Sequence, residues 1–337
     1  MGALLHRSDP RSRLRRLSED DQPRRWERER RHESTIVCGV DDSVHARAAA
    51  RLAAALAERF ELPLVLVHAV TASVPSRRGP AGPDVVPRFE DLLVRELDAA
   101  RRLEEEMRRE LGARQLRVDI RRGPAAPCIA AVADEENAAL VVVGCRGAGA
   151  FSAAVLGGVT DEIVGSAPCP VVVVPPVVAE TGAAPLTGES VLCGVQRSDD
   201  LACAQVAHEL ARGLGVRLSL AHVLPRSADA AALTPAGLVP ATLAARGVTR
   251  EGAACAALRR LRDRLPACGA TDLRVRRGDP GAQLAELAVA EDAMLVVTGA
   301  RRWRGPLRAA LLGSTSRQLA RAGRRPVVLC LDPARSR

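Results

Sequence analysis

The sequence predicts an α/β protein built of two tandem domains, each with a five-stranded, mainly parallel sheet that carries helices on both faces. Two observations lead to this fold class. The chain repeats itself at an offset of 155 residues, since 198 minus 43 separates the matching Ser43 and Ser198. Each copy alternates short β-branched runs with longer helical stretches, which is typical of βαβ units on a parallel sheet. A chain of 337 residues also has room for two domains of ordinary size.

The repeat is visible at several points along the chain. The segment Thr35-Ile-Val-Cys-Gly-Val-Asp-Asp-Ser43 corresponds to Ser190-Val-Leu-Cys-Gly-Val-Gln-Arg-Ser198. At the same offset, Arg121-Arg122-Gly123 corresponds to Arg276-Arg277-Gly278 and Gly144 to Gly299, while Pro170-Val171 matches Pro326-Val327 one residue further on. One domain has therefore been duplicated.

In the first copy, nearly continuous apolar runs predict strands that are buried on both faces. Their ranges are Thr35 to Val40, Leu64 to Val70, Leu116 to Arg121, Leu140 to Val143 and Val171 to Val174. Apolar residues at spacings of three and four predict the crossover helices. They comprise Ala48, Leu52, Ala55 and Leu56 in one helix and Phe89, Leu93, Leu97, Ala100, Leu103, Met107 and Leu111 in another.

The second copy follows the same scheme. Cys203, Val206 and Leu210 mark one helix, and Ala254, Leu258, Leu261 and Leu265 mark the next. Asp279-Pro280 provides an N-cap and first-turn pair for a third helix. We expect an N-terminal domain over residues 34–176, a linker over 177–188 in the Pro- and Gly-rich stretch from Pro175 to Gly188, and a C-terminal domain over 189–332.

Residues 1–33 contain ten Arg and seven acidic residues, which leaves a net charge of +3 and little apolar content. We expect a flexible, Arg-rich arm. The whole chain carries 49 basic and 40 acidic residues, or +9, but these charges are spread along the sequence. Interleaved acids and the scarcity of aromatic side chains argue against nucleic-acid binding by the arm.

Several function classes are excluded by composition. All basic residues are Arg, so the chain lacks the Lys that a Walker-A loop, a protein kinase or a pyridoxal enzyme requires. The nine Cys never fall in a C-x-x-C spacing, which favours buried thiols in a reducing cytoplasm over disulfides or zinc. No apolar run approaches the ~20 residues that span a bilayer. We therefore expect a cytoplasmic protein with no membrane association.

Ligands of open parallel sheets bind beyond the carboxyl ends of the strands, at the point where the strand order reverses. Asp41 follows the first strand, and its carboxylate is able to accept hydrogen bonds from ribose hydroxyls or an adenine amine. Gly144-Cys-Arg-Gly147 follows the fourth strand, and after nine more residues Gly157-Gly158-Val-Thr160 opens a helix. Glycines allow close approach of the backbone to phosphates, and the N–H groups at a helix start attract anions.

This ordered constellation, together with a strand that ends in Val67-His68-Ala69-Val70, resembles the universal stress protein family. The resemblance covers residues 34 to 176 and 189 to 332. It implies tandem Rossmann-like domains and, in ATP-binding members, a G-x-x-G-x9-G motif followed by Ser or Thr. By resemblance, Asp41 and the main chain at Ala69 contact the adenosine of ATP, which binds with or without Mg²⁺. Gly144, Arg146, Gly147, Gly157, Gly158 and Thr160 lie around its phosphates.

Two departures from the motif matter. Gly158 stands where the family has Ser or Thr, and only Thr160 is close enough in the sequence to provide the missing hydroxyl. In the second copy, Gln196 replaces Asp41 and Arg302 replaces the second Gly, although Gly313-Ser314-Thr315-Ser316 matches the family. We interpret the second site as degenerate.

Alternatives remain for single residues. Gly144 and Gly157 are also explained by close packing, and Asp41 by helix capping, for which Ser43 is a rival. His68 and His222 lie in apolar strands, where packed core histidines are favoured over a catalytic pair. Cys145, beside Arg146, is a candidate redox-sensitive thiol.

We interpret the protein as a stress-response regulator that binds ATP or a related adenine nucleotide in its N-terminal domain and acts by nucleotide-dependent association. No catalytic residue and no metal site is assigned. One alternative is an adenylate-transferring or weak ATP-hydrolysing enzyme. Another is a nucleotide-free interaction protein. The apolar edges Val171 to Val174 and Val327 to Cys330 are suited to pairing within the chain or across a homodimer.

Overall fold

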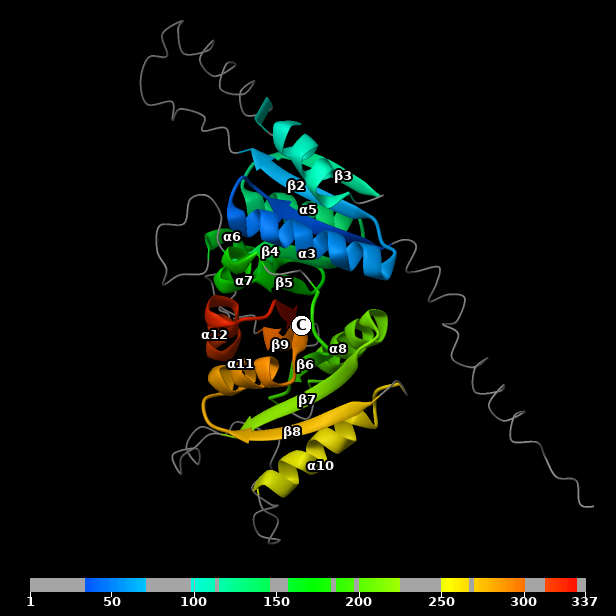
Figure 1. Ribbon diagram of the computed structural model, residues 1–337, viewed down its shortest axis with the longest axis vertical. Helices are drawn as coiled ribbons and strands as arrows, with labels where there is room; N and C mark the ends of the chain where they lie inside the picture. Colours follow the sequence, from blue (N-terminus) through cyan, green and yellow to red (C-terminus); the bar gives the residue numbers. More distant parts are fainter. Residues whose placement is uncertain are drawn as a thin grey trace, which may run out of the picture. The chain divides into compact units, whose positions relative to one another are not determined.

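The computed structural model describes residues 34–70, 98–99, 101–112, 115–145, 157–182, 186–196, 200–224, 250–266, 270–300 and 313–331. From Thr35 onward these residues belong to one compact unit, and its elements are labelled in Figure 1. The arm expected for residues 1–33 and the loops that carry Arg146, Gly147 and Arg302 lie outside the described residues.

The first half of this unit alternates strands and helices. Its elements are β1 (Thr35–Val40), α3 (Val44–Phe60), β2 (Leu64–Val70), β3 (Leu116–Arg122), α5 (Ala125–Glu135), β4 (Ala138–Gly144), α6 (Gly158–Ser166) and β5 (Val171–Val174). Residues 101–111, which precede β3, are also helical. Three of the predicted strands have the observed bounds, and β3 and β4 extend one or two residues beyond the prediction.

The second half repeats the order after a short helix, α7 (Pro176–Thr181). It consists of β6 (Ser190–Gly194), α8 (Leu201–Leu214), β7 (Arg217–Leu224), α10 (Arg250–Arg262), β8 (Thr271–Arg277), α11 (Pro280–Ala290), β9 (Ala293–Ala300), α12 (Ser314–Ala322) and β10 (Val327–Leu331). As predicted, Asp279 caps α11, because its side chain accepts a hydrogen bond from the Ala282 N–H.

The described strands form one ten-stranded sheet in the order β3-β2-β1-β4-β5-β10-β9-β6-β7-β8. Within each half the pairings are parallel. The halves join where β5 and β10 pair antiparallel, with Val172 opposite Val328. The pairing expected from the two apolar edges is therefore present within the chain, and Val172 and Val328 are fully buried.

Helices cover both faces of the sheet, and the alternation of side chains along each strand explains the apolar runs. In β1, Ile36 and Cys38 pack on the face that carries α3, while Val37 packs on the face that carries α5. All three side chains have 0% exposure. The same division holds in the second half, where α8 and α10 lie on one face and α11 and α12 on the other.

The linker expected over residues 177–188 contains part of α7, a short helix that the sequence analysis did not predict. Pro176 occupies the first turn, and Gly182 ends the helix in the left-handed conformation with φ of 61°. These are ordinary start and stop signals of a helix. Ala179 is buried where α7 packs against α3, so the connection is part of the core rather than a tether.

Candidate functional site

The candidate site lies at the topological switch point of the first half. The strand β1 has β2 on one side and β4 on the other, and the chain leaves β1 toward one face and β4 toward the other. Asp41 follows β1 directly, and Gly144 is the last residue of β4. Because the two strands are parallel neighbours, both residues lie at the same edge of the sheet, where ligands of this architecture bind.

The main chain of Ala69 lies next to Asp41. The register pairs Val40, the last residue of β1, with His68 of β2. The strand β2 continues through Ala69 and Val70, so its backbone passes the first residue after β1. This arrangement brings together the carboxylate and the main-chain segment that the resemblance assigns to adenosine.

The N-cap of α3 is Ser43 and not Asp41. Ser43 is the N-cap, because its side chain accepts a hydrogen bond of 3.1 Å from the Ala46 N–H. Asp41 lies outside the helix, and its Oδ1 accepts from the Ser43 N–H at 3.0 Å. This bond orients the carboxylate, and a carboxylate has about four lone-pair positions, so the bond does not exhaust its capacity.

His68 holds the end of β1 in place. Its Nδ1 lies 3.1 Å from the Val40 carbonyl oxygen, and because a carbonyl only accepts, Nδ1 carries the hydrogen. His222 makes the equivalent contact with Val195 at 2.8 Å, and burial lowers its pKa below the ordinary value. The interpretation as packed core histidines fits His222, which is buried, whereas His68 is half-buried. That interpretation did not include this hydrogen bond. The presence of His at the matching position of both copies was the signal.

The loop that joins β4 to α6 is closed by two hydrogen bonds at its ends. The Gly157 N–H donates to the Cys145 carbonyl at 2.8 Å, and the Thr160 hydroxyl donates to the Gly144 carbonyl at 2.9 Å. Arg146 and Gly147, which were also predicted to be site residues, lie outside the described residues. Whatever the path of the loop, it begins and ends at the carboxyl edge of β4.

Thr160 requires a correction. The sequence suggested that its hydroxyl replaces the one missing at Gly158, but the side chain is 1% exposed and its hydroxyl hydrogen is directed to Gly144. A hydroxyl has a single hydrogen to donate. The Thr160 side chain therefore has no hydrogen left to donate to a ligand. Ser316 makes the matching bond to Gly299 at 2.8 Å, so the role belongs to the fold of each half.

The first turn of α6 presents N–H groups toward the loop. Gly157 is the N-cap and provides no side-chain bond, and the first intrahelical bond runs from the Asp161 N–H to the Gly157 carbonyl. Gly158, Val159 and Thr160 precede that bond, so their N–H groups have no helical acceptor and favour an anion. A Cβ added at Gly158 would meet nothing within 4 Å, which means that the position next to this anion site is open.

Gly144 has a packing role as well. A Cβ at this position would lie 2.8 Å from the carbonyl carbon and oxygen of His45, a distance that real Cβ atoms do not show. At Gly299, its counterpart, the nearest atom to such a Cβ is the Cys203 sulfur at 3.5 Å. The glycine is thus sterically required in the first half only, because the first turn of α3 passes against the end of β4.

The equivalent edge of the second half differs. Gln196 follows β6 in place of an aspartate, and its N–H donates to Oδ2 of Asp200 at 2.8 Å. Gly313 is the N-cap of α12 and Ser314 begins the helix, so the end of the loop follows the motif while its beginning does not. Arg302 lies outside the described residues.

Cys145 does not fit a redox-sensitive thiol in this structure, since the side chain is 1% exposed. Reactive cysteines are partly accessible thiolates. Among the described residues, no group of three His, Cys, Asp or Glu side chains is arranged to hold a metal ion. None of the described helices is long and apolar enough to cross a membrane.

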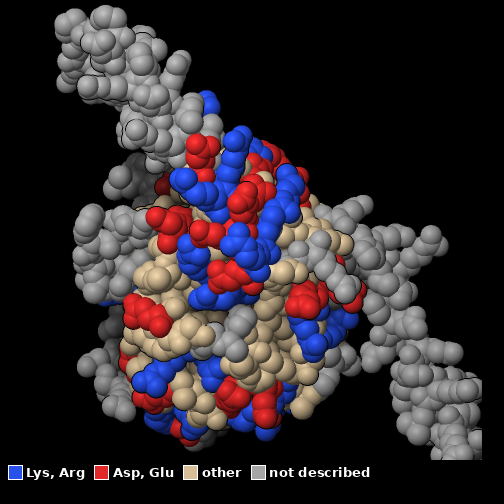
Figure 2. Space-filling model, turned by 45° about the horizontal axis from the view of Figure 1, so that its top comes forward, with Lys and Arg blue, Asp and Glu red and all other residues tan. Residues whose placement is uncertain are grey.

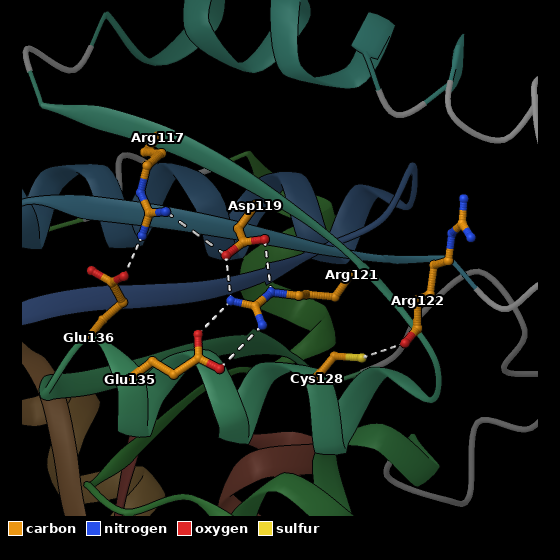
Figure 3. Close-up of polar contacts among 7 residues, drawn as sticks. All are labelled: Arg117, Asp119, Arg121, Arg122, Cys128, Glu135 and Glu136. Carbon is orange, nitrogen blue, oxygen red and sulfur yellow. Dashed lines mark hydrogen bonds and ion pairs between the residues drawn. The ribbon is translucent and has the colours of Figure 1, made fainter.

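Arginines on the described surface are interleaved with acids, and Figure 2 shows this mixture over one face. At β3, an outer strand of the sheet, Arg117 pairs with Glu136 at 2.5 Å, and Arg121 bonds both Asp119 and Glu135 (Figure 3). These hydrogen bonds raise the pKa of Arg121 above its ordinary value. Charged side chains along an edge strand discourage further sheet pairing.

Comparison with known proteins agrees with the duplicated fold. The model of the universal stress protein family matches residues 34–175 and again residues 189–330. A universal stress protein of Mycobacterium tuberculosis is 31% identical over 302 residues, which cover 88% of this chain and 96% of that protein. One of Mycolicibacterium smegmatis is 30% identical over 301 residues, with 87% and 96% covered. The crystal structure of a universal stress protein from Archaeoglobus fulgidus covers 89% of this chain and 97% of its own, with a TM-score of 0.57 and 15% identity, and shows the likeness of fold.

Proposed function

Because the chain belongs to the universal stress protein family, we propose that it binds ATP or a related adenine nucleotide in its first half and acts in the stress response by nucleotide-dependent association. The observation that carries this proposal is the convergence of three features at the switch point. They are the oriented carboxylate of Asp41, the main chain of β2 at Ala69, and the glycine loop, closed at its ends, that leads into the first-turn N–H groups of α6, which have no helical acceptor.

In this proposal the nucleotide spans the edge between β1 and β4. Asp41 accepts hydrogen bonds from the adenosine, and the Ala69 backbone supplies the main-chain contact beside it. The phosphates bind where the loop from Gly144 returns to Gly157, at the N–H groups of Gly158 and Val159. Mg²⁺, where it accompanies the nucleotide, supplies charge neutralisation to the phosphate oxygens.

The proposed mode of action is binding without rapid turnover. Fast phosphoryl transfer requires an aligned nucleophile and strong neutralisation of the developing charge. The hydroxyl nearest the loop end, that of Thr160, is directed to Gly144, and Asp41 is oriented by the backbone of α3. We propose that such a protein signals whether a nucleotide is bound, and that it does so through a change in its association.

Calorimetric titration of ATP tests the proposal on the full chain. We expect a single site per chain, a loss of affinity of about tenfold or more in Asp41→Ala, since hydrogen bonds to charged groups contribute ~1.5–3 kcal/mol, and no change in Gly313→Arg at the second-half loop. Asp41→Asn removes the negative charge and keeps the geometry, because the amide oxygen of Asn still accepts a hydrogen bond from the Ser43 N–H. If the folded protein binds no ATP, the proposal is wrong.

Association is tested separately by analytical ultracentrifugation with and without saturating ATP. We expect the sedimentation coefficient to change with ATP in the unaltered protein and to stay constant in Asp41→Ala. If ATP binds and the coefficient does not change in either protein, nucleotide binding stands and the association mechanism is wrong.

For the second half we propose a structural role without nucleotide. The residue in the place of Asp41 is Gln196, whose backbone is held by Asp200. A neutral amide there provides no carboxylate for adenosine. Gln196→Ala is accordingly expected to leave the stoichiometry and the affinity for ATP unchanged in the same calorimetric titration, whereas a second site lost in this variant would contradict the role.

A further inference from the structure

A cavity of about 400 Å³ lies on the face of the sheet that carries α3 and α7. Leu52 and Val174 of the first half, and Met294 and Pro326 of the second, line it, and Val177 and Val178 of α7 close one side. Its lining therefore comes from both sides of the junction where β5 pairs with β10. Its volume falls within the ~300–1,000 Å³ range of small-molecule sites, which favour such junctions.

The floor of the cavity is apolar and well packed. Leu52 and Val174 are 2% and 1% exposed, so they form a fixed base. Val177 is 40% exposed at the rim, one of the few large apolar side chains among the described residues that faces solvent. An apolar group bound against this wall would remove Val177 from water, which is favourable at ~25 cal/mol per Å² of apolar area.

Three arginines line the same cavity, and their partners differ. Arg51 pairs with Glu110 at 2.8 Å. Arg325 pairs with Asp292 at 2.7 Å and donates to the Thr187 carbonyl at 3.2 Å. Arg324 is exposed and has no ion pair with the described residues. The cavity therefore has one positive charge in excess next to an apolar wall.

We propose that this cavity binds a single-chain amphipathic carboxylate, such as a medium-chain fatty acid, with its tail on Leu52, Val174 and Val177 and its carboxylate on Arg324. An Arg guanidinium bonds a carboxylate through two parallel N–H groups. A nucleotide is disfavoured here, because a mostly apolar wall leaves ribose and base hydrogen bonds unmet. The ligand contacts both halves and stabilises their junction by mass action. Its lining shares no residue with the nucleotide site proposed at Asp41.

The test uses decanoate, below its micelle concentration, in calorimetric titration of the full chain. Decanol and decyltrimethylammonium serve as neutral and cationic controls with the same tail. Val177→Trp fills the rim of the cavity, and Val289→Trp places the same residue at an equally exposed valine of α11, on the other face of the sheet. Arg324→Ala removes the free charge, and Arg321→Ala removes an exposed arginine of α12 that does not line the cavity.

We expect decanoate to bind at least about tenfold more tightly than decanol, and to lose about tenfold in affinity in Arg324→Ala, the value of one charge-assisted contact. Val177→Trp abolishes binding, and the two controls bind as the unaltered protein does. Asp41→Ala and saturating ATP leave decanoate binding unchanged, so failure of the nucleotide proposal is seen separately. Equal binding of decanoate by Val177→Trp and Val289→Trp, or equal affinity for decanoate and decanol, overturns the proposal.

Discussion

Replacing Gly144 with Ala is expected to destabilise the protein, whereas the same change at its counterpart Gly299 is not. Gly144 is the last residue of β4, and Gly299 is the last but one of the equivalent strand β9. The carbonyl of each glycine accepts a hydrogen bond from a hydroxyl of the following helix. The two glycines are a matched pair, because both carbonyls accept a hydrogen bond from a hydroxyl and only the atoms next to the new Cβ differ. The experiment thus isolates the packing role of Gly144.

The magnitude follows from the contacts. At Gly144 the added Cβ would lie 2.8 Å from the His45 carbonyl carbon and oxygen and 2.9 Å from its Cβ. These atoms belong to the first turn of α3 and do not rotate away, and overpacking of this kind costs about 1–3 kcal/mol. A shift of Gly144 also weakens the 2.9 Å bond from Thr160, which contributes about 0.5–1.5 kcal/mol. We expect the free energy of unfolding to fall by ~2–4 kcal/mol.

At Gly299 the new Cβ would lie 3.5 Å from the Cys203 sulfur, an ordinary contact. The unfolded chain loses entropy when Gly becomes Ala, so a change of up to ~1 kcal/mol in the stabilising direction is expected. Gly158→Ala, in open space at the start of α6, should behave in the same way.

The assay is urea unfolding followed by far-ultraviolet circular dichroism. With a slope of about 2–3 kcal/mol per molar urea, the midpoint of Gly144→Ala should lie roughly 1 M below that of Gly299→Ala. If the two variants unfold at the same urea concentration, contact with His45 does not explain the glycine. A purely ligand-binding role for Gly144 would then be the better account.

Three further predictions use the same assay. Gly213→Ala should lower the midpoint, since its Cβ would overlap the Phe60 ring where α8 meets α3. Phe60→Leu should restore part of the loss, and additive effects of the two changes would rule out the contact. Burial lowers the pKa of His222, so the folded state binds fewer protons than the unfolded one. Stability should therefore fall as pH decreases below about 6.5, less steeply in His222→Asn, and an unchanged slope would exclude this histidine as a source. Asp119→Ala should lower the free energy of unfolding by less than ~1 kcal/mol, because the pair of Asp119 with Arg121 is partly exposed. A larger loss would mean that the ion pairs at β3 contribute substantially to stability.

The strands and most helices follow from patterns that the sequence carries locally. Residues 171–174 are four consecutive valines, which only a strand buried on both faces accommodates well, and the structure has them as β5 with all four buried. The helix α7 was missed because Pro, Gly and Thr near residues 175–188 suggested a loop. Its position depends on packing against α3, a contact between segments far apart in the sequence.

The candidate site was predictable as a location and less so in its details. Asp41 and Gly144 lie at one edge, as the topology requires. The hydrogen bond of His68 to Val40 and the direction of the Thr160 hydroxyl depend on three-dimensional register, which residue types alone do not determine. In both cases the duplicated copy carried the information, since His222 and Ser316 make the same bonds.

The two halves depart from the family's motif at different positions. The first keeps the carboxylate of Asp41 but has Gly158 at the start of its helix, and the second keeps Ser314 but has Gln196 after its first strand. Neither departure lies at the junction of the halves, where Val327 and Val328 are fully buried and β10 pairs with β5. An unpaired β5 would expose an apolar edge that invites association with other chains. The second half covers this edge of the first through β10, a contact in which Gln196 takes no part.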